Sequence, residues 1–342
     1  MTISDIKLFF SQLSEPGQSY LLSQLISIKD TSDFNLLTIR EQQLNNKVGC
    51  CPHCDSPKYN KDGHEKSGVQ RYVCKSCKRN FNPFTGTWLT MINKRELLVP
   101  YIKLMEQGLS LEKIKDSLDI NKKTAFDWRH KICSSLNSVE EQDFSGITES
   151  DETFFLHSKK GDKDLDRKPR KRGGSAEKRG INEEQVAAIV TMDRDNAVDL
   201  KVSCLGRITK DDIVHAIGDK INDRTILCSD GHVSYKGFAM DNHLEHHVLK
   251  ANIKQYCIAG TYHIQHVNSA HSRLKSWITG DLYGVATKYL QNYLNWFRIR
   301  EKFEGITVLK KIMKSALDVC GNLKYRGIKH EYEKLIISSQ KT

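Results

Sequence analysis

The spacing of apolar residues changes several times along the chain, and each change predicts a different kind of element. Residues 1–45 carry apolar side chains three and four positions apart, as in Leu21 and Leu25, which predicts two or three short helices. Between residues 50 and 88 this spacing is lost, and short β-like pieces take its place. From residue 94 to about residue 136 the helical spacing returns.

The second half of the chain alternates between strand-like and helix-like segments. A helix is expected over residues 210–221, and helical spacing runs from residue 263 to the end with breaks at Gly280 and Gly284. This order of elements predicts an α/β domain with a mixed sheet covered by helices. It also fits a ribonuclease-H-like domain, although many α/β folds share it. The expected strands cover residues 147–156, 185–192, 197–204, 225–228 and 244–249.

A long polar segment separates the first two of these strands. Residues 158–182 contain the sequence KKGDKDLDRKPRKRGG, which has too few apolar side chains to bury a core. We expect a mobile loop here, and its most basic part is Arg170, Lys171 and Arg172.

The net charge suggests a class of partner. The 342 residues include 53 Lys and Arg against 42 Asp and Glu, a formal charge of +11, which favours nucleic acid, although a soluble protein of another class could reach the same charge. The longest apolar run is about five residues, Val186 to Val190, whereas a membrane span needs roughly 18 to 20. The start MTISDIKLFF lacks the features of an export signal. We therefore expect a cytoplasmic protein with no membrane partner.

Two Cys-x-x-Cys pairs give the most specific signal. Cys51 and Cys54 are followed, after nineteen intervening residues, by Cys74 and Cys77. Four thiolates at this spacing can surround one tetrahedral Zn²⁺, and the intervening stretch is long enough for a β-hairpin, so the spacing predicts a zinc ribbon. Two unrelated pairs of reduced thiols are the alternative, and the neighbouring Cys50 and His53 are competing ligands.

Residues 108–130 resemble a helix-turn-helix. Ile114 and Leu118 would pack the first helix, Ile120 would cap the turn, and Ala125, Trp128 and Ile132 would form the inner face of the second helix. The alternative is an ordinary helical hairpin with a solvated basic face. The residues expected to face DNA are Lys122, Lys123, Thr124, Arg129 and Lys131.

Acidic residues lie in and after two of the expected strands. Asp151 and Glu149 share one face of the first strand, and Glu152 lies on the opposite face. Asp230 follows the buried strand 225–228, at the carboxyl end where open α/β sheets place their sites. Two such carboxylates can bind Mg²⁺, a cation that prefers oxygen ligands. Taken singly, each Asp would more often be a turn residue or a helix cap.

A polar helix near residue 268 adds to this set. Asn268 and Lys275 are seven residues apart, which places them two turns apart on one face of a helix. An amide followed by Lys at that spacing could bind a metal ion and a phosphate together. Without the two aspartates, a solvated helix surface would explain the pattern as well.

The ordered combination of these motifs resembles a known family. Over about residues 50–302 the sequence looks like a bacterial insertion-sequence transposase of the zinc-ribbon, ISXO-type group. The matching features, besides the cysteine pairs and the helix-turn-helix, are Glu149-x-Asp151-Glu152-Thr153, Ser229-Asp230-Gly231, Tyr235, His263-x4-Asn268, Lys275 and the segment from Tyr289 to Phe297.

The resemblance implies a fold and a reaction. It implies a ribonuclease-H-like core with an Asp, Asp, Glu/Asn triad, which carried over by position is Asp151, Asp230 and Asn268, with Lys275 as the basic companion. DNA cleavage and strand transfer would use two Mg²⁺ (or Mn²⁺) ions about 3.5 to 4 Å apart, with Asp151 bridging them. Double-stranded DNA would be bound at inverted-repeat ends by the ribbon, the helix-turn-helix and the basic loop, and the ends joined by a homodimer or a larger synaptic complex.

The sequence departs from this group at two places. The third triad position is Asn where most two-metal transposases have Glu, and the loop from Lys159 to Arg179 has no catalytic counterpart. Two alternatives therefore stay open: a transposase-derived DNA-binding regulator that does not cut, and a nuclease of the same fold that cuts without joining. The expected domains are a helical segment (1–45), a zinc ribbon (46–90), a helix-turn-helix region (91–140), a catalytic domain (145–302) and a helical tail (303–342).

Overall fold

The computed structural model describes residues 3–15, 17–18, 21, 49–137, 139, 143–163, 165, 168, 174–303, 305–318 and 325–339. The chain forms two compact units, one from residues 1–102 with 305–322 and one from residues 103–304 with 323–342. The helices expected between residues 22 and 45, and the basic loop residues Arg170, Lys171 and Arg172, lie outside the described residues. Among the described helices, none is long and apolar enough to cross a membrane.

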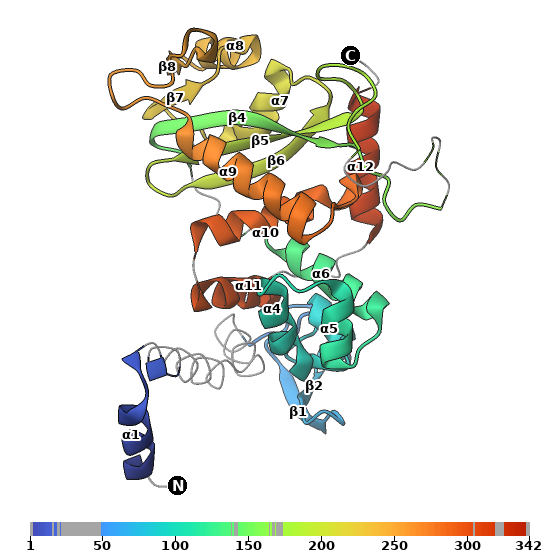
Figure 1. Cartoon of the computed structure of the whole chain (residues 1–342). Helices are drawn as coiled ribbons and strands as arrows, with labels where there is room; N and C mark the ends of the chain where they lie inside the picture. The colour runs from blue at the N-terminus through green and yellow to red at the C-terminus, as the bar shows by residue number, and fades with distance from the viewer. Residues whose placement is uncertain are drawn as a thin grey trace. The chain divides into compact units, whose positions relative to one another are not determined.

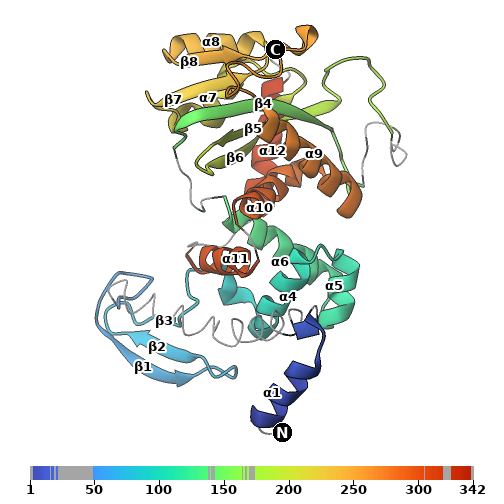
Figure 2. The same cartoon turned by 60° about the vertical axis from the view of Figure 1, so that its left-hand side comes forward.

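The first unit contains a small antiparallel sheet. Its strands are β1 (Tyr59–His64), β2 (Gln70–Cys74) and β3 (Asn80–Phe81), in the order β1-β2-β3 (Figure 2). Tyr59, Tyr72 and Phe81 pack on one another with ring centroids 5.3 to 5.4 Å apart, and they give this small sheet its apolar core. The unit also contains α1 (Ile3–Gln12), the 3₁₀ turns η1 (Trp88–Met91) and η2 (Arg95–Leu97), and α11 (Ile306–Asp318), which packs against η1.

The second unit is built on a five-stranded mixed sheet. The strand order is β6-β5-β4-β7-β8, with β4, β5 and β6 antiparallel and β7 and β8 parallel to β4 (Figure 1). This ribonuclease-H-like arrangement confirms the predicted fold class. The strands are β4 (Gly146–Leu156), β5 (Gln185–Asp193), β6 (Val198–Leu205), β7 (Thr225–Ser229) and β8 (Glu245–Val248).

Helices cover both faces of this sheet. On one face, α7 (Lys210–Ile217) and α8 (Val233–Asp241) bury a core that includes Ala187, Ile189 and Tyr235. On the other face, α9 (Gln265–Ser276) packs on β4 and β5, and α10 (Leu290–Lys302) packs on β6, as Figures 1 and 2 both show. Side chains alternate along a strand, so Glu149 and Asp151 face α9, whereas Ser150 and Glu152 face α8. The helix α12 (Tyr325–Ser339) also packs on β6, whereas α4 (Leu98–Glu106) contains the boundary between the two units.

Two helices at residues 111–135, joined by three residues, lie where the helix-turn-helix was expected. Ser110 caps α5 (Leu111–Leu118) by accepting a hydrogen bond from the N–H of Lys113, and Asn121 caps α6 (Lys122–Ser135) by accepting one from the N–H of Lys123. Asp119, in the three-residue turn, has φ 47° and ψ 53°, the left-handed conformation that ends a helix. This pair belongs to the same compact unit as the mixed sheet.

The second helix of the pair is joined to α10 by buried polar side chains. Ser134 Oγ donates to Asn292 Oδ1 at 3.0 Å, and Asn292 Nδ2 lies 3.2 Å from His130 Nδ1. Arg298, which is 4% exposed, donates to the carbonyl oxygen of Leu136 at 2.6 Å, just past the end of α6, and lies 3.6 Å from Asp199 in β6. Because buried polar groups are costly when left unpaired, this network fixes α6 on α10.

Candidate functional site

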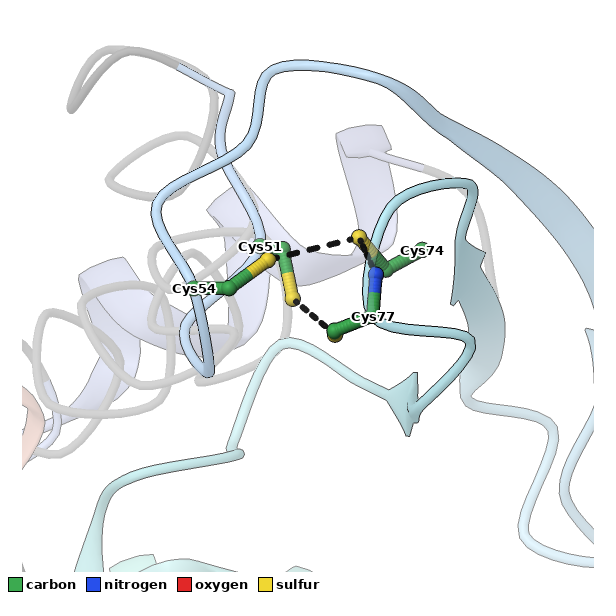
Figure 3. A group of neighbouring side chains, drawn as sticks. All are labelled: Cys51, Cys54, Cys74 and Cys77. Carbon is green, nitrogen blue, oxygen red and sulfur yellow. Dashed lines mark hydrogen bonds between the residues drawn. The ribbon is translucent and has the colours of Figure 1, made fainter.

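The four cysteines of the two Cys-x-x-Cys pairs converge next to β2. The sulfur atoms of Cys51 and Cys77 are 3.7 Å apart, those of Cys54 and Cys74 are 3.6 Å apart, and all four lie within 4.8 Å of one another (Figure 3). Four sulfurs placed 2.3 Å from a tetrahedral zinc ion would be about 3.8 Å apart. The donor set and its spacing therefore fit one Zn²⁺.

The backbone of each pair folds into the same tight turn. The N–H of Asp55 donates to the carbonyl oxygen of Cys51 at 2.8 Å, and that of Lys78 donates to the carbonyl oxygen of Cys74 at 3.1 Å. Asp55 and Lys78 both have positive φ, 56° and 60°, which lets the chain turn back after the second cysteine of each pair. The two ligand turns are therefore related in both sequence and geometry.

The two competing ligands lie outside this group. His53 Nε2 is 3.2 Å from the carbonyl oxygen of Asn80, and neither His53 nor Cys50 belongs to the cluster of four sulfurs. Among the four, the backbone N–H groups of Cys77 and Ser76 lower the pKa of the Cys74 thiol to about 6, whereas burial raises the pKa of Cys51 to about 12. Without a metal ion the four sulfurs would not all be thiolates at neutral pH, so metal binding should release protons.

The two aspartates meet where β7 ends beside β4. Glu149 of β4 pairs with Cys228 of β7, so Asp151 and Asp230 are each two positions further along adjacent parallel strands. The Asp151 side chain is 16% exposed. Burial raises the pKa of Asp151 to about 8, and the nearby charges of Glu152 and Asp230 raise it as well. The structure thus brings together the two predicted carboxylates, and a cation would relieve their mutual repulsion.

Glu152 is a third carboxylate in this group, which sequence reasoning placed only on the opposite face. Burial and the charge of Asp230 raise the pKa of Glu152 to about 7, and its Oε2 atom is buried without a hydrogen-bond partner in the described part of the chain. Asp230 follows the end of β7, so it influences carboxylates on both faces of β4. Strand alternation alone could not indicate this.

Helix α9 brings polar side chains close to Asp151. His271 is buried, and its Nδ1 atom lies 3.9 Å from Asp151 Oδ2. Asn268 and Lys275 are exposed and lie one turn before and one turn after His271. The charge of Lys275 lowers the pKa of Asp151, which shows that it lies near that carboxylate. For the Asn268 side chain, no hydrogen bond to either aspartate is found among the described residues.

Next to this group, Glu149 anchors the amino end of α9. Its carboxylate accepts hydrogen bonds from the backbone N–H groups of His266 and Val267 and pairs with Arg194. Sequence reasoning placed Glu149 correctly on the face of Asp151, but it missed Arg194, which lies in the turn after β5 and belongs to no motif.

The helix pair presents fewer free basic residues than the sequence predicted. Arg129 is 3% exposed, donates to the carbonyl oxygen of Leu109 at 2.9 Å, and has its guanidinium carbon 5.6 Å from the ring centre of Trp296. The prediction that Arg129 faces DNA is therefore wrong, because α10 covers this side of α6. Lys131 is 19% exposed and pairs with Asp127 at 2.8 Å.

The basic residues that stay at the surface are those of the first turn of α6. Lys122 and Lys123 are exposed and Thr124 is half-buried. Lys122 also pairs with Glu112 of α5 at 2.8 Å. In helix-turn-helix proteins the amino-terminal residues of the second helix contact base edges. The exposed residues Lys122 and Lys123 occupy the corresponding positions of α6.

Comparison with known proteins finds a similar domain over the sheet and its carboxylates. Residues 143–302 match the ISXO2-like transposase domain. This region is similar to that family of transposase domains. The matched range begins just before β4 and ends with α10, so it contains Asp151, Asp230 and all of α9.

Similar proteins include one sequence relative and two solved structures. The chain is 24% identical over 273 residues to an uncharacterized protein in transposable element ISH50 of Halobacterium salinarum, covering 78% of this chain and 91% of that protein. Among solved structures, the Mos1 strand transfer complex matches 66% of this chain and 76% of that chain, with 11% identity and a TM-score of 0.26. The Drosophila P element transposase strand transfer complex matches 68% and 61% respectively, with 12% identity and a TM-score of 0.26.

Proposed function

We propose that this chain is a DNA transposase that cleaves the ends of an insertion sequence and joins them to target DNA in a metal-dependent reaction. One observation supports this above the others. Within the matched range, Asp151 lies in β4 and Asp230 follows the adjacent parallel strand β7, close enough that the charge of Asp230 raises the pKa of Asp151. Clustered, partly buried carboxylates of this kind are costly unless a cation accompanies them.

The residues present suit a pair of hard divalent cations such as Mg²⁺ or Mn²⁺. Asp151 and Asp230 supply carboxylate oxygens, the donors that these ions prefer. When bound, the two ions would stabilise charge on the attacking and leaving oxygens of the phosphoryl transfer. Lys275 is exposed and lies near Asp151, so its ammonium group can neutralise a phosphate at the rim of the same site.

Asn268 is our choice for the third ligand, and His271 is the second candidate. The resemblance by motif favours Asn268, whereas the 3.9 Å contact with Asp151 favours His271. Burial lowers the pKa of His271 to about 4, so its ring is neutral at pH 7, and its Nε2 atom has no partner among the described residues. A neutral imidazole is a competent metal ligand.

DNA is the partner that this reaction requires. The accessible first turn of α6, with Lys122 and Lys123, is suited to the major groove. The small sheet β1–β3 and its four cysteines, which we call the cysteine module, would hold one structural Zn²⁺ and form a second DNA-binding element. Two element ends must be joined, so a homodimer or larger synaptic complex is the proposed active form.

Labelled DNA carrying the inverted repeats that flank the gene tests this function. The wild-type chain should cut this DNA in Mg²⁺ or Mn²⁺ and join the cut end to a target, whereas Asp151→Asn and Asp230→Asn should bind the ends and do neither. End binding without cleavage by the wild type would indicate a regulator. Cleavage without joining would indicate a nuclease.

A further inference from the structure

Glu149 is a buried carboxylate that holds the start of α9. Its side chain is 1% exposed. One oxygen, Oε2, accepts hydrogen bonds from the backbone N–H groups of His266 at 2.9 Å and Val267 at 3.2 Å. The first N–H groups of a helix have no partner within the helix, and α9 has no side-chain cap of its own at Ile264. Glu149 therefore takes the place of a cap from a neighbouring strand.

The second oxygen of Glu149 contacts three side chains. Oε1 lies 2.8 Å from Arg194 Nη2, 2.6 Å from His266 Nδ1 and 3.3 Å from His263 Nδ1. Arg194 comes from the turn after β5, and His263 comes from the segment before α9. A single carboxylate therefore connects β4, the turn between β5 and β6, and both sides of the amino end of α9.

Glu149, His263 and His266 could in principle bind a metal ion, because their ligand atoms lie within 4.8 Å of one another. Arg194 argues against this use. Its guanidinium already pairs with Glu149 Oε1, and its nitrogens lie 2.6 Å from His266 Nδ1 and 3.3 Å from His263 Nδ1. A cation at this position would have to displace a positive charge that already neutralises the carboxylate. We therefore treat the cluster as an ion-paired network.

The position of the network relative to Asp151 indicates what it does. Glu149 and Asp151 are two residues apart on one face of β4, which is paired with β5 on one side and, at Glu149, with β7 on the other. On α9, His271 follows His266 by five residues and lies 3.9 Å from Asp151. The network and the proposed metal site are thus two contacts between the same strand and the same helix.

We infer that Glu149 is a positioning residue, which sets the register of α9 on β4 and so places the polar side chains of α9 opposite Asp151. This inference rests on the proposed function. The positioning depends mainly on the length of the Glu149 side chain, which must extend from β4 to the backbone of α9. It depends less on the charge of Glu149, because Arg194 neutralises that charge.

Two variants separate the length of the Glu149 side chain from its charge. Glu149→Asp keeps the charge but is one methylene shorter. Glu149→Gln combined with Arg194→Gln keeps the reach and an acceptor oxygen while removing the ion pair. Mn²⁺ binding to the full-length, zinc-loaded chain is measured by electron paramagnetic resonance. The part of this binding that is lost in Asp151→Asn is assigned to the proposed site. We expect Glu149→Asp to weaken this binding about 10- to 100-fold, the usual cost of disturbing the support of a metal ligand, and the double variant to stay within about threefold of wild type.

A matched control separates positioning from general destabilisation. Asp199 is also a buried carboxylate, 4% exposed and paired with Lys220 at 2.7 Å, but it lies in β6 away from α9. Asp199→Asn should lower the unfolding temperature and leave Mn²⁺ affinity unchanged.

Three outcomes would contradict the proposed catalytic site or the positioning role of Glu149. Wild-type Mn²⁺ binding that Asp151→Asn does not alter would refute the proposed catalytic site itself. If that binding depends on Asp151 but Glu149→Asp binds as tightly as wild type, the positioning role is wrong. A second zinc per chain that His263→Ala removes would also overturn it, because a metal ion would then replace Arg194.

Discussion

His271 Nδ1 lies 3.9 Å from Asp151 Oδ2, which makes this buried imidazole a direct neighbour of a proposed metal ligand on a different element. Asn268, the residue chosen from the motif, lies on the same face of α9 but is exposed. Separating these two side chains is therefore the sharpest test of the site.

Substitutions at Asn268 and His271 should differ in their effect on cleavage. If Asn268 is the third ligand, Asn268→Ala should reduce the rate at least about tenfold and Asn268→Glu should retain activity with an altered metal preference, because a carboxylate replaces the amide as an oxygen donor. His271→Ala should then have the smaller effect. The measurement is the cleavage rate on end DNA across a series of Mg²⁺ and Mn²⁺ concentrations. The opposite order of effects would assign the position to His271.

Removal of zinc should unfold the cysteine module alone. In Cys74→Ser, the remaining three sulfurs bind zinc less tightly, and the small sheet loses the metal that contributes to its folding. Elemental analysis should find one zinc per chain in the wild type and less than one in the variant, while hydrogen exchange in β4 to β8 stays unchanged. Cys257→Ser, which changes an exposed cysteine outside the cluster, is the control and should keep its zinc. Wild-type protein without zinc would contradict this prediction.

The carboxylate cluster should make stability depend on pH in the metal-free protein. Burial raises the pKa values of Asp151 and Glu152 to about 8 and about 7, above their ordinary values. A raised carboxyl pKa means that the folded state binds protons more tightly than the unfolded state, so this stabilisation is complete below about pH 4, the ordinary carboxyl pKa, and is lost progressively as pH rises from there to about 7 to 8. The unfolding temperature should therefore fall over that range.

Mg²⁺ should reverse this loss, because the ion competes with protons for the same oxygens. The increase in unfolding temperature on adding Mg²⁺ should be larger at pH 8.5 than at pH 6. Thermal unfolding at both pH values checks this, and Asp151→Asn should show a weaker dependence on both pH and Mg²⁺. An Mg²⁺ effect that shrinks as pH rises would contradict the assignment.

The two kinds of basic residue on α6 should respond differently to substitution. Replacing Lys122 and Lys123 with Ala should weaken binding to end DNA and reduce the slope of log affinity against log salt by up to about 2, since each phosphate contact contributes about 0.9. Lys334→Ala, which removes an exposed lysine of α12, should leave both quantities unchanged. Fluorescence anisotropy over a range of salt concentrations measures both.

Arg129→Ala should act on stability instead. It removes a hydrogen bond from a buried charged group, worth about 1.5 to 3 kcal/mol, together with the contact with Trp296. Urea unfolding should show this loss. If Arg129→Ala unfolds like wild type but binds DNA more weakly, the surface role first predicted for it would be restored.

The sequence predicted those features that depend on local spacing. The strand at 147–156 and the cysteine turns follow from alternation and from ligand chemistry, and the structure has both. The burial of Arg129 does not follow in this way, because it depends on Trp296, which is distant in sequence. Which side of a helix becomes covered is decided by the packing partner, and periodicity does not identify that partner.

The same reason explains why the Glu149 network was missed. Glu149 and His266 are 117 positions apart in the chain, and Arg194 comes from a turn without any motif. The sequence placed Glu149 on the face of Asp151, but that face acquires a function only when α9 and the turn after β5 lie on it. Contacts between distant segments give a site its geometry, and single motifs carry little information about them.

The link through Arg298 has a consequence for where the proposed transposase would cut DNA. Arg298 contacts both the carbonyl group after α6 and Asp199 in β6, so the proposed reading helix and the sheet that bears Asp151 move as one body. DNA held by α6 would then meet the cutting site a constant number of base pairs away. Adding base pairs between the recognised sequence and the element's end should shift the cut into the added DNA, at an unchanged distance from the recognised sequence.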